Sequence, residues 1–154
     1  MNSTVLKNTV SLDTLITYIK ALFVGTIPSL IWLLFWLQED RETPEPRRLI
    51  MATFLVGMFG VMIVLPFQKI ALTVFRDSSF LVVVLALIEE LVKCILVFLV
   101  IRPTRQINQP IDYAIYLIII GLGFAALENT LYILKPLLLK DSSAVFLTGN
   151  LRFM

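Results

Sequence analysis

The chain contains four long apolar segments, and each approaches the length needed to cross a membrane. A helix rises about 1.5 Å per residue, so about 20 residues span the ~30 Å hydrocarbon core. The segments lie at about residues 18–37, 49–67, 80–101 and 113–139. The hydrophobic content of 58% is more than a soluble domain of 154 residues could bury. Both observations predict an all-α fold, a polytopic transmembrane bundle of four helices.

Polar segments connect these helices and predict short links. Residues 38–48 combine several charges with Pro44 and Pro46, which can neither stay in lipid nor continue a helix. Residues 69–79 and 102–112 join the later helices, and short links make sequential helices antiparallel neighbours. The arginines of the first and third links favour a cytoplasmic position for both, by a small margin.

The last residues of the sequence indicate a further helix. After Lys140 and Asp141 the chain becomes apolar again at 144–147 and reaches Met154 without a polar tail. We therefore expect residues 1–154 to form a single transmembrane helical domain with the start of a fifth helix near its end. We also expect this domain to be the N-terminal part of a longer protein.

The charged residues and the absent residue types exclude several functions. A net charge of +2 does not indicate a basic surface for binding nucleic acid. The expected partner of the apolar segments is the lipid bilayer. Cys94, the single cysteine, cannot form an intramolecular disulfide. The sequence has no histidine, which is the usual catalytic base and the commonest zinc ligand. Chemistry in this sequence must therefore rest on carboxylates.

The third apolar segment carries two adjacent acids and a base at its centre. Glu89, Glu90 and Lys93 are flanked on both sides by apolar sequence. An ionised group at that depth costs from about 3 to over 10 kcal/mol unless it is paired, protonated or hydrated. An ion pair between Glu89 and Lys93, at positions i and i+4, would explain one carboxylate as a packing device. Glu90 points about 100° away and needs its own partner or a proton, which favours a functional site.

The fourth apolar segment carries small residues followed by a polar pair. Gly121 and Gly123 are more typical of close packing against a neighbouring helix than of a nucleotide loop. Glu128 and Asn129 follow within two turns, and Tyr132 lies one turn after Glu128. A packing role, in which Asn129 donates an interhelical hydrogen bond, would explain why an amide stands here but not why Glu128 stands beside it. The carboxylate favours a site that holds water or a substrate carbonyl.

Crowded carboxylates in an apolar site predict acid–base chemistry. Their repulsion leaves one ionised base beside a protonated acid, which is the arrangement needed to activate water. A glutamate base could deprotonate water while Lys93 or Asn129 stabilises the developing oxyanion, a coherent route to amide hydrolysis. We expect Glu89, Glu90, Lys93, Glu128 and Asn129 to converge on one cavity between the third and fourth helices, because each is costly to present to lipid.

At these residues the sequence resembles the PrsW family of intramembrane proteases, which is related to the CAAX-protease and Abi group. Three matches carry the resemblance: the acidic Pro-rich stretch at 40–46, the Glu-Glu-x-x-Lys motif at 89–93, and the Gly-Phe-Ala-x-x-Glu-Asn-x-x-Tyr segment that ends at Tyr132. The resemblance implies a membrane endopeptidase that hydrolyses peptide bonds of a membrane-protein substrate. It also implies an integral protein of a bacterial or archaeal plasma membrane.

The resemblance assigns roles to individual residues. The catalytic carboxylates would be Glu89, Glu90 and Glu128, and the supporting polar residues would be Lys93, Asn129, Tyr132 and Arg152, the last at the start of the next conserved helix. Members are sometimes classed as metalloproteases, and the family's histidines lie on later helices. No metal ligand set is predicted within these residues; a divalent metal such as zinc would need ligands from a part of the protein beyond Met154.

Two functions of other classes also fit these residues. Intramembrane glutamate, lysine and asparagine side chains build coupling sites in proton- or ion-coupled transporters and in channels, which would transport without cleaving peptides. A non-enzymatic membrane adaptor or immunity protein would use the ion pair only to hold helices together, and apolar replacements would preserve its function.

Overall fold

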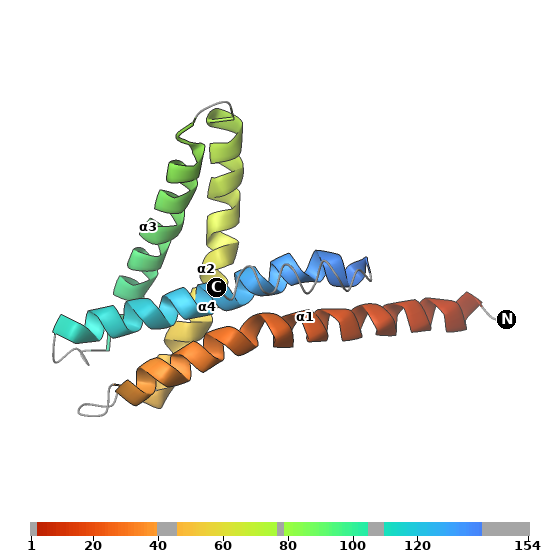
Figure 1. Ribbon diagram of the computed structural model, residues 1–154, viewed down its shortest axis with the longest axis horizontal. Helices are drawn as coiled ribbons and strands as arrows, with labels where there is room; N and C mark the ends of the chain where they lie inside the picture. The colour runs from red at the N-terminus through yellow and green to blue at the C-terminus, as the bar shows by residue number, and fades with distance from the viewer. Residues whose placement is uncertain (1–2, 40–45, 77–78, 105–109, 140–154) are drawn as a thin grey trace.

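The computed structural model describes residues 3–39, 46–76, 79–104 and 110–139, and they form four helices (Figure 1). The helices are α1 (Ser3–Glu39), α2 (Arg47–Val74), α3 (Leu81–Ile101) and α4 (Pro110–Leu138). The predicted all-α fold with four helices is confirmed. The proposed start of a fifth helix falls outside the described residues.

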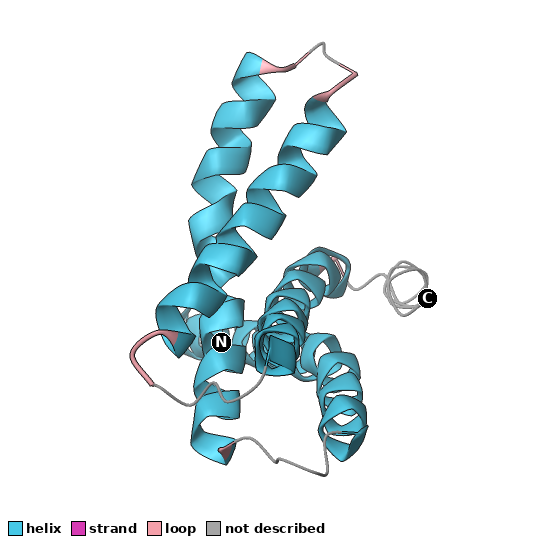
Figure 2. Cartoon of the chain, turned by 90° about the vertical axis from the view of Figure 1, so that its left-hand side faces the viewer, coloured by secondary structure: helices cyan, strands magenta, loops and turns pink. Residues whose placement is uncertain are grey.

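Helix α4 is the centre of the arrangement, because it contacts each of the other three helices. It lies side by side with α1 and runs antiparallel to it (Figure 1). Helices α2 and α3 form a hairpin that stands steeply across this pair (Figures 1 and 2). The base of the hairpin packs on α4, whereas its tip extends away from α1, which leaves an angle between the hairpin and α4.

Helices α1, α2 and α4 extend beyond the apolar segments that predicted them, whereas α3 matches its segment. Helix α1 has 37 residues, which is about 55 Å at 1.5 Å per residue and longer than the hydrocarbon core is thick. Helix α2 continues through Gln68 and Lys69 to Val74, so part of the predicted link at 69–79 is helical. Asp112, which the prediction placed in a link, lies buried in the first turn of α4. Apolar residues show which part of a helix can contact lipid. The helix itself continues into polar residues as long as its backbone hydrogen bonds are formed, so its ends lie beyond the apolar segment.

Three helices in the described part of the chain are long and apolar enough to cross a membrane: α1, α2 and α4. Helix α3 has 21 residues but carries three charged side chains near its middle. Large apolar side chains on all four helices are exposed, among them Phe23, Phe59, Val82 and Ile111. Lipid is the environment that covers such a surface without cost, so the protein is an integral membrane protein.

Glycines allow α2 and α4 to approach at backbone distance. A Cβ atom on Gly57 would meet the carbonyl oxygen of Ile120, and one on Gly123 would meet the carbonyl oxygen of Phe54. Around these contacts Phe54 and Ile120 are buried in the larger core cluster. Gly121 differs, because a Cβ atom there would meet nothing within 4 Å. The packing interpretation of the two glycines in the fourth segment therefore holds for Gly123 and is wrong for Gly121.

The two glycines of α4 provide a matched test of this packing. Replacing Gly123→Ala forces a methyl group against the backbone of α2 and is expected to lower the free energy of unfolding by about 1–3 kcal/mol. Replacing Gly121→Ala adds the same methyl group to open space and is expected to leave it unchanged or raise it slightly. Thermal unfolding of both variants in detergent measures the difference. Equal destabilisation by the two substitutions would contradict the α2–α4 contact.

Candidate functional site

A cavity of about 370 Å³ lies in the angle between the α2–α3 hairpin and α4. Its polar lining comes from all three helices: Gln68 of α2, Glu89 of α3, and Glu128 and Tyr132 of α4. The rest of the lining is apolar and consists of Val61, Val64, Leu65, Leu72, Leu85, Phe124 and Leu131. The cavity therefore gathers two carboxylates, an amide and a phenol within an apolar wall.

Helical periodicity brings these side chains to the cavity. On α4, Phe124, Glu128 and Leu131 recur at a spacing of four and three residues and so share one face. On α3, Leu85 and Glu89 lie one turn apart on the face toward α4. The two glutamates are 39 positions apart in the chain, and only the packing of the hairpin against α4 brings them to one space.

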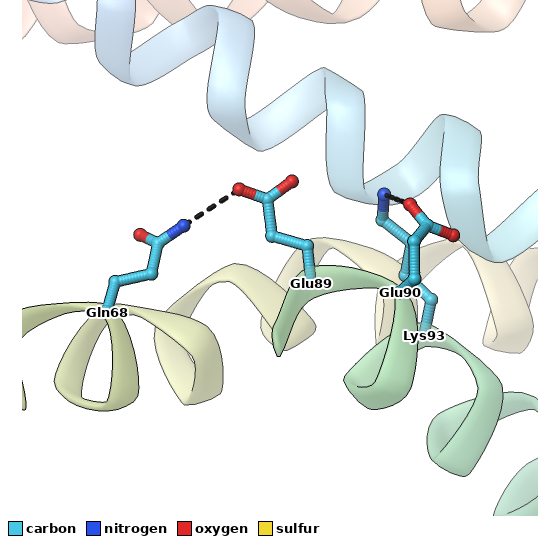
Figure 3. A network of polar contacts seen from close by, with 4 residues as sticks. All are labelled: Gln68, Glu89, Glu90 and Lys93. Carbon is cyan, nitrogen blue, oxygen red and sulfur yellow. Dashed lines mark hydrogen bonds and ion pairs between the residues drawn. The ribbon is translucent and has the colours of Figure 1, made fainter. Parts of the chain in front are cut away.

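Glu89 is held by a side chain from the neighbouring helix. The Gln68 amide Nε2 donates a hydrogen bond of 2.7 Å to Oε1 of Glu89, and both side chains are partly buried (Figure 3). The two residues are separated by 21 positions and face each other across the hairpin. A hydrogen bond from an amide to a carboxylate restricts the carboxylate's rotamers and stabilises its ionised form.

Opposite charges act on Glu89 within the cavity. The carboxylate of Glu128 repels it, whereas the ammonium group of Lys93 attracts it. The Lys93 Nζ atom lies over the ring of Phe124, 4.7 Å from its centre, so this side chain leans from α3 toward α4. Lys93 is only 16% exposed. A half-buried cation thus stands beside the pair of carboxylates.

The ion pair on α3 differs from the one that the packing alternative assumed. Nζ of Lys93 lies 2.7 Å from Oε1 of Glu90, at i and i+3, and not against Glu89 at i and i+4 (Figure 3). The Glu90 side chain is 63% exposed and is not part of the cavity lining. The prediction that Glu89 and Glu90 point in different directions is confirmed, and the packing alternative, in which Lys93 pairs with Glu89, does not match this ion pair. Lys93 can reach either neighbour because its four-carbon chain is flexible.

The expectation of one cavity shared by all five polar residues was therefore wrong. Glu89 and Glu128 line it, and Lys93 lies at its wall. Asn129 is buried on the opposite face of α4, where it lines a second cavity of about 510 Å³ against α1 together with Ser29. Adjacent residues on a helix diverge by about 100°, so Glu128 and Asn129 face different helices. Arg152 lies outside the described residues.

Sequence reasoning missed Gln68. It stands between the second apolar segment, which was placed at 49–67, and the link at 69–79. Two signals could have found it. Apolar residues resume directly after Lys69, which predicts that the helix continues, and Val64, Gln68 and Leu72 share a four-residue spacing. A polar residue on an otherwise apolar stripe of a membrane helix indicates a functional position.

Comparison with known proteins identifies the family. Residues 45–154 match the family model described as PrsW family intramembrane metalloprotease. The chain belongs to the PrsW family. It is 32% identical over 117 residues to Protease PrsW of Clostridioides difficile (strain 630), and 30% identical over 118 residues to Protease PrsW of Geobacillus kaustophilus (strain HTA426). Both alignments cover 71% of this chain and about half of the relative, 49% and 50%.

The comparisons confirm the resemblance to PrsW proteins and the membrane location. The PrsW relatives are bacterial, which agrees with the expected plasma membrane. The chain spans about half the length of the curated PrsW proteins it matches. No solved structure matches it.

The PrsW family description names a metal, and the described residues do not form a complete metal site. No group of three His, Cys, Asp or Glu side chains that could hold an ion occurs among them. A catalytic zinc ion usually has three protein ligands, whereas the cavity contributes the carboxylates of Glu89 and Glu128. These two groups alone do not fit such a centre.

The different surroundings of the two acids on α3 predict different effects on stability. Replacing Glu89→Gln retains an acceptor for Gln68 and removes the repulsion from Glu128, so the melting temperature should stay the same or rise. Replacing Glu90→Gln removes the ion pair with Lys93 and should lower the free energy of unfolding by at most about 1 kcal/mol. Differential scanning fluorimetry in detergent measures both. A clear loss of stability for Glu89→Gln would contradict this view of the site.

Proposed function

We propose that this chain supplies the carboxylate part of the active site of an intramembrane endopeptidase, with a membrane protein as substrate. One observation carries the proposal: Glu89 of α3 and Glu128 of α4 line one cavity inside an otherwise apolar helical assembly. Two carboxylates in such surroundings are costly, and a packing role requires neither. Membership of the PrsW family supports the same activity.

In this proposal Glu89 is the general base. Its carboxylate takes a proton from a water molecule as the water oxygen attacks the carbonyl carbon of the peptide bond. The 2.7 Å hydrogen bond from Gln68 stabilises the negative charge on Glu89 that this step requires. The cavity volume of about 370 Å³ is enough for a water molecule and the reacting segment of a peptide.

Glu128 is the proposed general acid. Glu128 lines the same cavity from the opposite helix, so in this proposal it hands a proton to the nitrogen of the scissile bond. Transfer of this proton to the leaving amine completes hydrolysis, and the proton taken up by Glu89 restores Glu128 for the next cycle. The Tyr132 hydroxyl, which also lines the cavity, is a candidate donor to the developing oxyanion.

The remaining polar residues have supporting roles in this proposal. Glu90 holds Lys93 beside the cavity through the 2.7 Å ion pair. Asn129 belongs to the cavity between α1 and α4, so we do not assign it to the oxyanion. A divalent metal would need ligands besides the carboxylates of Glu89 and Glu128, so no step of this proposal uses one.

Substitution of the glutamates in the full-length protein tests the proposal. Replacing Glu89→Gln or Glu128→Gln keeps the side-chain shape and removes the acid–base group, so cleavage of a membrane-protein reporter should fall about 10²- to 10⁴-fold. Replacing Glu90→Gln should cost less, because Glu90 lies outside the cavity. The measurement is reporter cleavage beside a blot of the membrane fraction, which controls for insertion.

Two results would contradict the proposal. Wild-type cleavage by both Glu89→Gln and Glu128→Gln would refute carboxylate catalysis. A full-length wild-type protein that cleaves no reporter but moves protons or ions across liposomes, with loss of flux in the same variants, would indicate the coupled transporter.

A further inference from the structure

The side chain of Gln68 is the part of the cavity that no family motif accounts for. It lies outside the acidic stretch and outside the two glutamate motifs that carry the resemblance to PrsW proteins. On α2 it stands in line with Val64 and Leu72, which line the same cavity and are apolar. Helix packing alone would be satisfied by another apolar residue here, so the amide needs a separate explanation.

We propose that Gln68 is the positioning residue for Glu89: its amide holds the carboxylate in the cavity and favours the ionised form that accepts a proton from water. This inference rests on the proposed function. Its basis is the 2.7 Å hydrogen bond from Nε2 of Gln68 to Oε1 of Glu89, made between two partly buried side chains of different helices. Figure 3 shows the amide and the carboxylate pointing toward each other across the hairpin.

The choice of an amide follows from the charges around Glu89. Glu128 faces it from α4 and repels it, Lys93 on α3 attracts it, and Glu90 on α3 repels it and binds the Lys93 ammonium. Tyr132 of α4 is a further ionisable group in the lining. Gln68 adds a hydrogen-bond donor from α2 that carries no charge at any pH. A cation at this position would attract both Glu89 and Glu128, whereas the amide binds Glu89 without adding a charge.

The hydrogen bond also fixes how Glu89 presents its two oxygens. A general base must present a free oxygen to the water while its other oxygen is fixed. Binding Oε1 to Gln68 leaves Oε2 of Glu89 for the reaction, and it restricts the carboxylate to one orientation relative to α4.

Kinetics of the full-length protein test the role of Gln68. Replacing Gln68→Met keeps the length of the side chain and removes the donor. At neutral pH kcat should fall about 10- to 100-fold, the loss expected for a hydrogen bond to a charged group, with KM changed less than about twofold. Because the ionised form of Glu89 loses a stabilising partner, the acidic limb of the pH–rate profile should move upward by about one unit and activity should recover at higher pH.

Two further variants separate a hydrogen bond from packing or polarity. Replacing Ile70→Met changes an exposed residue of the same helix that lies outside the cavity lining, and it should leave kcat and the pH profile unchanged. Replacing Gln68→Asn keeps an amide but shortens it by one methylene, so the donor falls short of Glu89 and the variant should behave like Gln68→Met. Wild-type kinetics in Gln68→Met, or a pH profile that stays in place while kcat falls, would overturn the proposal, as would wild-type behaviour of Gln68→Asn.

Glu89→Gln identifies which proposal has failed. An inactive Glu89→Gln together with a wild-type Gln68→Met would reject the positioning role and retain carboxylate catalysis. A fully active Glu89→Gln would reject the proposed function itself. Circular dichroism and thermal unfolding in detergent should show the same fold and similar stability for Gln68→Met and Ile70→Met, so that loss of activity is assigned to the site.

Discussion

The close backbone contact between α2 and α4 is the interaction on which the site depends. Gly57 and Gly123 bring the two helices together at a distance that no side chain would permit. Helix α3 packs more extensively on α2 than on α4, so the position of α2 largely sets that of α3. Glu89 therefore reaches the neighbourhood of Glu128 through a contact in which neither glutamate takes part.

The angle between the hairpin and α4 has a chemical consequence. A parallel bundle would fill the space between α3 and α4 with side chains, whereas here the hairpin stands steeply on α4 (Figure 1). The cavity lined by both glutamates lies between them. Desolvated carboxylates must find donors or share a proton, and the cavity supplies Gln68 and, at its wall, Lys93. The same apolar lining that makes the charges costly also strengthens each electrostatic interaction they make.

The sequence predicted correctly those features that depend on a single helix, and it failed for features that depend on how two helices pack. The divergence of Glu89 and Glu90 follows from the 100° step of a helix, and the exposed Glu90 agrees with it. The same step applied to Glu128 and Asn129 predicts that they diverge, yet both were expected in one cavity. Periodicity shows that neighbours face different directions, but it does not show which helix each direction meets. The same holds for Gly121 and Gly123, which are two residues apart. Gly121 faces open space and Gly123 packs against α2, and the sequence of α4 alone does not show which glycine meets the neighbouring helix.

The sequence by itself determined the helical class, the membrane environment and the family, because apolar length, intrahelical periodicity and short motifs are local properties of the chain. It also identified Glu89 and Glu128 as costly groups that require an explanation. Only the tertiary structure decided that these two share a cavity while Glu90 and Asn129 do not, that Lys93 pairs with Glu90, and that Gln68 binds Glu89. These facts depend on the crossing of separate helices, which side-chain shape at interhelical contacts sets and which no single segment encodes.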